Sequence, residues 1–240
     1  MQSMRRLADR RGEFIAMVRE SGLRHATNLA ARASLPRRVV EFRRLFIVEL
    51  DLRSVPRDAP DDSDIEEITA DVLGTRIDPG EAEALLRGRL RAGRRLWVVT
   101  RAGRVAAYDC LGGESRAISP WLVVNAEDGG IWSEMIRVAR DFRGQGLGPR
   151  LRAHVARHCA RAGYARMIGF IDTTNRNSIS ALGKVGFVPI GRIFFVRILG
   201  LTVIHHGPTW RLGRWTADRP LEIPVGATRN HATCQARAIG

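Results

Sequence analysis

The sequence predicts an α/β fold, and three observations along the chain support this prediction. Residues 131–138 have the pattern of a strand, and beyond a glycine-rich turn the apolar residues after Pro149 recur at helical spacing. The apolar runs 96–100 and 104–108 flank a short turn, as the two arms of a β-hairpin do. Residues 79–91 carry the capping signals of a helix. Strand and helix patterns therefore alternate, which is typical of the α/β class.

Capping residues and short apolar runs set the bounds of the other elements. A first strand is expected at residues 65–68. Asp78 suits the N-cap of the helix over residues 79–91, and Gly93 lies just past its end. Pro79 suits the first helical position because its φ is already close to the helical value. Further strands are expected at residues 119–124, 167–171, 191–199 and 201–205, the last two joined by a turn at Gly200.

Composition divides the chain into four segments. Residues 1–55 predict a basic helical extension followed by a strand, and residues 56–63 a linker rich in proline and aspartate. Residues 64–206 predict the main domain, and residues 207–240 a weakly structured tail. The arginine-rich extension could pack on the core, contact an oligomer partner or lie on an anionic membrane surface. Its short, interrupted apolar face favours packing or an oligomer contact over the membrane surface.

The net charge of +14 suggests anionic partners, but its origin weakens that suggestion. Lys184 is the only lysine, so arginine supplies nearly all of the positive charge. A GC-rich coding bias produces such a composition, and we therefore do not expect a nucleic-acid partner. The 240 residues suffice for one well-buried core with appendages or for two small domains.

Cysteine usage and apolar run lengths predict a cytoplasmic protein. Cys110, Cys159 and Cys234 are odd in number and have no partner at metal-ligand or redox spacing, so a reducing compartment is expected. No apolar run approaches the 18 residues of a membrane span, and the N-terminus lacks the apolar core of a secretion signal. No metal-binding constellation is recognised.

Three glycines, Gly144, Gly146 and Gly148, lie between the strand at 131–138 and the helix that follows. Glycine lets the backbone approach a ligand closely, and a helix N-terminus favours negative charge, so the turn predicts a pyrophosphate site. Its G-x-G-x-G spacing departs from the dinucleotide fingerprint G-x-G-x-x-G, and no Gly-Lys-Ser/Thr of a phosphate loop follows.

With Arg143, this turn resembles the Arg/Gln-x-x-Gly-x-Gly/Ala signature of the GCN5-related N-acetyltransferase (GNAT) superfamily. Residues 138–144 are similar to the family's Val-x-Pro-x-x-Arg-Gly run, with Arg140 where proline is usual. Residues 175–187 resemble the second motif, Asn-x-x-Ala/Ser followed by a short helix that ends in Gly-Phe. The resemblance covers residues 64 to about 205.

The resemblance implies the GNAT fold, a mixed and mostly antiparallel central sheet flanked by helices, with acetyl-CoA held in a splayed V between two strands. It implies transfer of an acetyl or other acyl group to a primary amine, with no metal. The loop amides would hold the pyrophosphate, the preceding strand would pair with pantetheine, and Asn175 would contact the arm or cap a helix. The implied cofactor-binding residues are Ile136, Arg137, Val138, Arg143, Gly144, Gln145, Gly146, Leu147, Gly148 and Asn175.

The catalytic groups match the family less well. Many members place a tyrosine four residues before the glycine of Gly-Phe, where it protonates the departing thiolate, and this chain has Leu182 there. Glu134 is the candidate base, because strand alternation places it on the same face as Ile136 and Val138. A surface or salt-bridged carboxylate is the alternative interpretation of Glu134, and Asp109 and Tyr108 on the hairpin are weaker alternatives for the base.

The leucine at position 182 leaves two other functions open. One is a catalytically weak or inactive CoA-binding module used in regulation or assembly. The other is an acyltransferase of surface polysaccharide or lipid biosynthesis, which the basic N-terminal arm suggests weakly. The acceptor is not specified, because acceptor sites are built from variable loops on a shared scaffold.

Overall fold

A nine-stranded mixed sheet organises the fold in the computed structural model, which describes residues 27, 40–56, 62–74 and 78–226. Its strand order is β11-β10-β9-β1-β8-β7-β4-β3-β2, and every neighbouring pair is antiparallel except β7 and β8. The predicted mixed, mostly antiparallel sheet is thereby confirmed. The strands are β1 (Val40–Asp51), β2 (Ile65–Ile68), β3 (Arg95–Arg101), β4 (Arg104–Leu111), β7 (Gly130–Val138), β8 (Arg166–Asp172), β9 (Val188–Ile198), β10 (Leu201–His206) and β11 (Thr209–Gly213).

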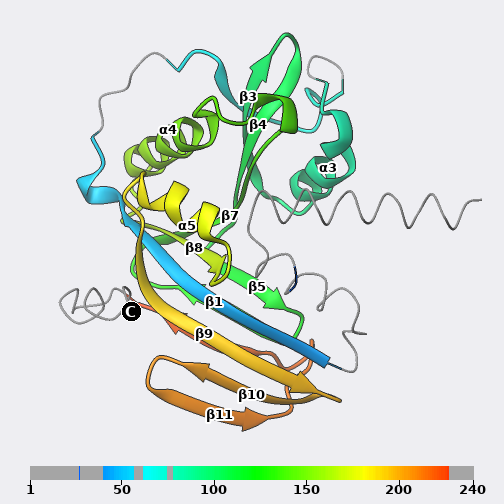
Figure 1. The fold of residues 1–240 in the computed structure, drawn as a ribbon, viewed down its shortest axis with the longest axis vertical. Coiled ribbons are helices and arrows are strands. Elements are labelled where there is room, and N and C mark those ends of the chain that lie inside the picture. Colours follow the sequence, from blue (N-terminus) through cyan, green and yellow to red (C-terminus); the bar gives the residue numbers. More distant parts are fainter. Residues whose placement is uncertain (1–26, 28–39, 57–61, 75–77, 227–240) are drawn as a thin grey trace, which may run out of the picture.

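Strand β1 lies in the middle of this sheet, between β8 and β9 (Figure 1). The segment boundaries predicted from composition separate this strand from the main domain, and the structure differs. Ile47, Val48 and Leu50 are buried in the sheet's two apolar faces, so β1 is part of the domain core. The predicted helical extension before β1 lies outside the described residues, apart from residue 27.

A second, three-stranded sheet covers part of one face of the large sheet. It consists of β5 (Ser115–Ser119), β6 (Leu122–Ala126) and β12 (Leu221–Val225), in the order β12-β6-β5. The prediction of a weakly structured tail from residue 207 is wrong for β11 and β12. In β12, Leu221, Ile223 and Val225 alternate along the strand and are buried, because β12 pairs with β6 and packs on the large sheet. Pro224 is tolerated because β12 is an edge strand.

Helices cover both faces of the large sheet (Figure 1). Apolar residues of α4 (Leu147–Arg161) and α5 (Arg176–Gly183) pack on one face, with Leu151 and Val155 fully buried. On the other face, α3 (Glu83–Arg91) packs through Leu86. The remaining short helices are the 3-10 turns η1 (Leu52–Ser54), η2 (Gly80–Ala82) and η3 (Arg140–Phe142).

The helix predicted over residues 79–91 forms with a tighter first turn. Residues 80–82 are a 3-10 turn, and the α-helix proper begins at Glu83. The Asp78 carboxylate accepts a hydrogen bond from the Gly80 N–H at 2.8 Å, so it caps the 3-10 turn. Gly93 follows the helix with φ of 70°, a left-handed conformation that glycine adopts without strain.

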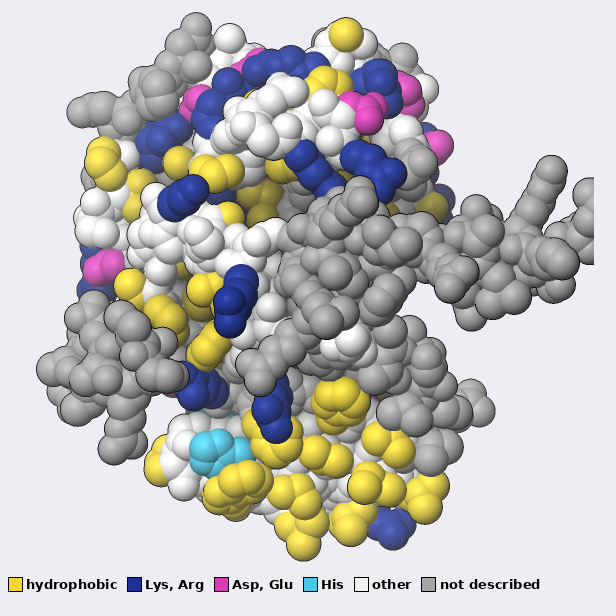
Figure 2. All heavy atoms as spheres, in the orientation of Figure 1, with side chains coloured by type: hydrophobic (Ala, Val, Ile, Leu, Met, Phe, Trp, Pro, Cys, Tyr) yellow, Lys and Arg dark blue, Asp and Glu magenta, His cyan; other side chains and the backbone are white. Residues whose placement is uncertain are grey.

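The large sheet ends at β11, whose outer edge has no partner strand among the described residues. Apolar side chains gather on the surface of this end, as the lower part of Figure 2 shows. Trp210 is 61% and Leu212 67% exposed, and Leu199 in the β9–β10 turn is 69% exposed. An oligomer contact stays a prediction, since the structure describes one chain.

Arg166, the first residue of β8, connects three other parts of the fold. Its side chain is 1% exposed, and its Nη1 donates to Glu49 of β1 at 2.7 Å. Its Nη2 donates to the carbonyl oxygens of Glu127 and Val225, the latter at 2.9 Å. One buried guanidinium therefore ties β8 to β1, to the turn before β7 and to the last described strand.

Replacing Arg166 with Met should lower the free energy of unfolding by about 3–5 kcal/mol, because Glu49 would be left buried without its partner. Urea unfolding followed by circular dichroism measures this change. Arg104→Met is the matched control, since the ion pair that the Arg104 side chain makes with Asp141 among the described residues is exposed and 3.9 Å long. A loss for Arg166→Met no larger than that of the control would contradict the structural role of this arginine.

Candidate active site

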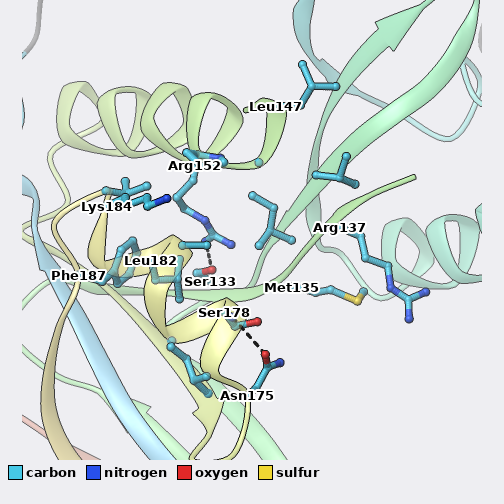
Figure 3. A pocket seen from close by; sticks show the side chains of 18 of the residues that line it. Ser133, Met135, Arg137, Leu147, Arg152, Asn175, Ser178, Leu182, Lys184 and Phe187 are labelled. Carbon is cyan, nitrogen blue, oxygen red and sulfur yellow. Dashed lines mark hydrogen bonds between the residues drawn. The ribbon is translucent and has the colours of Figure 1, made fainter. Parts of the chain in front are cut away.

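The site begins where β7 and β8 stop pairing. The two strands run parallel from Gly130 and Arg166 to Ser133 and Gly169, and then separate. Beyond Ser133, β7 pairs with β4 alone, so its other edge borders a cavity of about 570 Å³. The loop before α4, the end of β8 and α5 complete the cavity walls (Figure 3).

The glycines of the loop are explained by the backbone. Gly144 and Gly146 have φ of 79° and 71°, in the left-handed region, and an added Cβ would meet no atom within 4 Å. Gly148 instead allows close packing, since a Cβ there would lie 3.4 Å from Val138. Helix α4 begins at Leu147, two residues before the predicted start, and Gly146 has no side chain to cap its first turn. The first-turn N–H groups therefore suit an anion.

Of the ten residues implied for cofactor binding, nine line this cavity, and Gln145 is the exception. The Arg143 guanidinium folds back on the strand, with Nε donating to the Val138 carbonyl at 3.3 Å. Asn175 caps α5, since its Oδ1 accepts from the Ser178 N–H at 3.1 Å (Figure 3). The capping role considered for Asn175 is therefore present, and its side chain also borders the cavity.

Glu134 lines the cavity, but its side chain is not on the strand face that the alternation predicts. Cys110 pairs with Met135 but the next residue of β4, Leu111, pairs with Ser133, so Glu134 is the extra residue of a β-bulge. The bulge breaks the alternation, and the Glu134 carboxylate lies on the face covered by α3. Val138 faces α4 instead. There it packs against a cluster of buried apolar side chains, here called the α4 cluster, which includes Leu151 and Val155 of α4 and Ile131 of β7.

Two arginines form ion pairs with the Glu134 carboxylate. Arg89 of α3 contacts Oε2 at 2.7 Å and Arg94 contacts Oε1 at 2.9 Å, while the glutamate side chain is 3% exposed. Gly112 makes room for this arrangement, since a Cβ there would lie 2.8 Å from Oε1. The contacts match the salt-bridged alternative, with each carboxylate oxygen held by one arginine.

Arg116 of β5 occupies the point where the two strands part. Its guanidinium donates to the carbonyl oxygens of Ser133 at 3.0 Å and Glu134 at 2.8 Å, and lies over the Phe170 ring. Burial lowers the pKa of Arg116 to about 10, with the charge of Glu134 acting in the opposite direction. Arg116 therefore supplies hydrogen bonds that the departing β8 no longer provides.

A buried ion pair, absent from the predicted site, lies at the floor of the cavity. Arg152 of α4 is 2% exposed, its Nε lies 3.1 Å from Asp109 Oδ2, and its Nη1 donates to the Ser133 hydroxyl. Burial raises the pKa of Asp109 to about 6, opposed by the Arg152 charge, and burial lowers the pKa of Arg152. Asp109 in the otherwise apolar β4 was the signal in the sequence, because a carboxylate in a buried strand needs a cationic partner.

Leu182 lines the cavity at the position where the family has tyrosine, and packs against the α4 cluster. The side-chain hydroxyls among the described lining residues belong to Ser133 and Ser178. Tyr108 is 4% exposed and belongs to the apolar cluster with α3, so it is outside the cavity lining.

The described residues contain neither a metal-binding cluster nor a membrane-spanning helix. No cluster of three or more His, Cys, Asp or Glu side chains in that part of the chain could hold a metal ion. Nor is any helix there long and apolar enough to cross a membrane. The cytoplasmic location stays a prediction.

Solved structures with related folds share little sequence with this chain. A putative GNAT-family acetyltransferase from Novosphingobium aromaticivorans is 19% identical, with a TM-score of 0.46 over 70% of this chain and 67% of that one. A GNAT-family acetyltransferase from Colwellia psychrerythraea is 14% identical, with a TM-score of 0.44 over 66% and 56%. The aminoglycoside N-acetyltransferase AAC(6′)-Iy in complex with CoA is 19% identical, with a TM-score of 0.40 over 52% and 91%. The chain thus spans 56% to 67% of the first two.

Family membership follows from a profile match. No curated protein matches the sequence. The family model described as the acetyltransferase (GNAT) family matches residues 65–187, about half of the 240 residues. This range runs from β2 to Phe187 and contains the parted strands, the glycine loop and Asn175. The chain therefore belongs to the acetyltransferase (GNAT) family, whose members are transferases that use acetyl-CoA.

Proposed function

We propose that this chain transfers an acetyl group from acetyl-CoA to a primary amine. One observation carries the proposal: the glycine loop at the start of α4 and the free edge of β7 line the same cavity of about 570 Å³. The loop suits a pyrophosphate, and the strand edge suits an extended arm that contains amide groups. CoA carries both groups in that order.

In the proposed reaction the amine nitrogen attacks the thioester carbonyl carbon, a C–N bond forms and the C–S bond breaks. Backbone N–H groups of Ile136 and Val138 would hold pantetheine and polarise the carbonyl, because they face the free edge of the strand that lines the cavity. The Arg137 N–H has the parity of the Ala139 N–H, which donates to β4, so Arg137 would border the ligand without donating from its backbone. Asn175 would contact the arm or a bound water beside its cap to α5. Holding the two reactants together supplies much of the rate acceleration.

A catalytically inactive CoA-binding module is the second candidate function. Leu182 favours it, because the residue that lines the cavity there has no proton to give. The ion-paired state of Glu134 favours it as well, since neither carboxylate oxygen is free of an arginine. Both candidates require CoA to bind, so turnover separates them.

Incubation with acetyl-CoA and a panel of primary amines should release CoA thiol with at least one class of acceptor. The panel contains aliphatic diamines, amino sugars, amino acids and peptide N-termini, and a thiol reagent measures release against an amine-free control. Binding of acetyl-CoA in calorimetry without thiol release on any amine would favour the inactive module. Absence of binding would contradict both candidates.

Gly146→Val should raise the Kd of acetyl-CoA at least tenfold, about 1.4 kcal/mol, because the side chain would obstruct the approach of phosphate to the loop. Gly163→Val is the matched control. Gly163 also has a positive φ, 89°, and open space around it, but it follows the C-terminal end of α4. Calorimetry should therefore show unchanged affinity for the control, and unchanged affinity for Gly146→Val would place CoA elsewhere.

Glu134→Gln tests the candidate base. Because both oxygens are held by arginines, we expect a loss of about 1–3 kcal/mol in the free energy of unfolding and less than a tenfold fall in kcat. Glu67→Gln, which breaks the half-exposed pair with Arg95 away from the cavity, is the control. A fall in kcat of a hundredfold or more with stability and CoA affinity retained would instead identify Glu134 as the base.

A further inference from the structure

Among the described residues that line the cavity, Arg152 has the most deeply buried charged side chain. It is 2% exposed, and Figure 3 shows it reaching from α4 across the cavity toward Ser133. Its Nη1 lies 3.8 Å from the Met167 sulfur, and its guanidinium carbon lies 5.9 Å from the centre of the Phe187 ring. Apolar and aromatic groups thus surround much of the guanidinium, and little water reaches it.

Packing alone does not account for this arginine. Burying an ion pair costs desolvation free energy, and replacing such a pair with apolar residues of similar size is often neutral or stabilising. The neighbouring α4 residues Leu151 and Val155 meet the same sheet through apolar side chains. The contact with Asp109 is also incomplete, because Arg152 Nε and Asp109 Oδ2 lie 3.1 Å apart without forming a hydrogen bond.

The position of Arg152 matches the far end of the proposed substrate arm. Val138 packs beside the glycine loop, and Ser133 is the last β7 residue paired with β8. Four residues lie between them, so the two are five steps apart along the strand, or ~17 Å. An arm anchored by its phosphates at the loop and extended along β7 therefore brings its sulfur toward Ser133, where the Arg152 guanidinium lies.

We propose that Arg152 stabilises the thiolate of CoA as it leaves, in place of the hydroxyl that Leu182 lacks; this inference rests on the proposed function. When the C–S bond breaks, its electron pair stays on sulfur, and the guanidinium donates a hydrogen bond to that anion without losing a proton. The proton lost by the attacking nitrogen goes to water. Asp109 balances the Arg152 charge before the thiolate forms.

The proposal predicts a pH-dependent affinity for CoA that its analogue without sulfur does not share. If Arg152 faces the thiol, the bound thiol has a lower pKa than the free one, and CoA binds more tightly as the pH rises between those two values. The ratio of the Kd of desulfo-CoA to that of CoA cancels effects common to both ligands. Calorimetry from pH 7 to 10 should show this ratio rising at least tenfold for the unaltered protein.

The variant Asp109→Leu/Arg152→Met removes both charges together, so neither is left buried alone, and its ratio should stay flat with pH. Lys184→Met is the matched control, because Lys184 is an exposed cation of the same cavity, and the rise should persist. A flat ratio in the unaltered protein, or a rise retained in the double variant, would overturn the proposal. Failure of both ligands to bind the unaltered protein would overturn the proposed function itself.

Discussion

The parting of β7 from β8 after Ser133 and Gly169 is the constraint on which the site depends. Parting two strands exposes backbone hydrogen-bonding groups, which are costly to bury without partners. Arg116, which belongs to β5 of the small sheet, offsets this cost by donating hydrogen bonds to the carbonyl oxygens of Ser133 and Glu134. On the opposite face, Arg152 fixes the Ser133 hydroxyl. The edge of β7 beyond Ser133 is available to a ligand, because arginine side chains rather than a neighbouring strand hold the backbone at Ser133 and Glu134 in place.

Buried charge is arranged on both faces of the same strands. Glu134 pairs with Arg89 and Arg94 on the face covered by α3, whereas Arg152 pairs with Asp109 on the face covered by α4. The β-bulge at Glu134 is what separates the two networks, because it turns one extra residue toward α3. The glutamate carboxylate is consequently held by arginines on the α3 side, and the Arg152 cation lies at the cavity floor beside the Ser133 hydroxyl.

Local patterns in the sequence predicted the parts of the fold that local physics controls. Gly144 and Gly146 adopt the left-handed backbone that a turn onto a helix N-terminus requires, so their meaning could be inferred without a fold. The helix near residues 79–91 and the hairpin of β3 and β4 depend on caps and turns, which are equally local. The prediction of a weakly structured tail failed for β12, because this strand is stable only when paired with β6 and packed on the large sheet.

Residues close together in the chain are enough to show that a glycine-rich loop opens a helix after a strand, and that an asparagine and a Gly-Phe pair follow in the GNAT order. Packing, in contrast, fixes which face of its strand or helix each polar side chain occupies. A single bulge moved Glu134 away from Ile136 and Val138, and no local pattern marks that bulge. Asp109 signalled that a cationic partner was needed, but the sequence did not show that this partner is Arg152. The two lie 43 positions apart in the chain, and only the packing of α4 on β4 brings them to 3.1 Å. Burial gives both charges their energetic weight, and burial is a property of the assembled sheet.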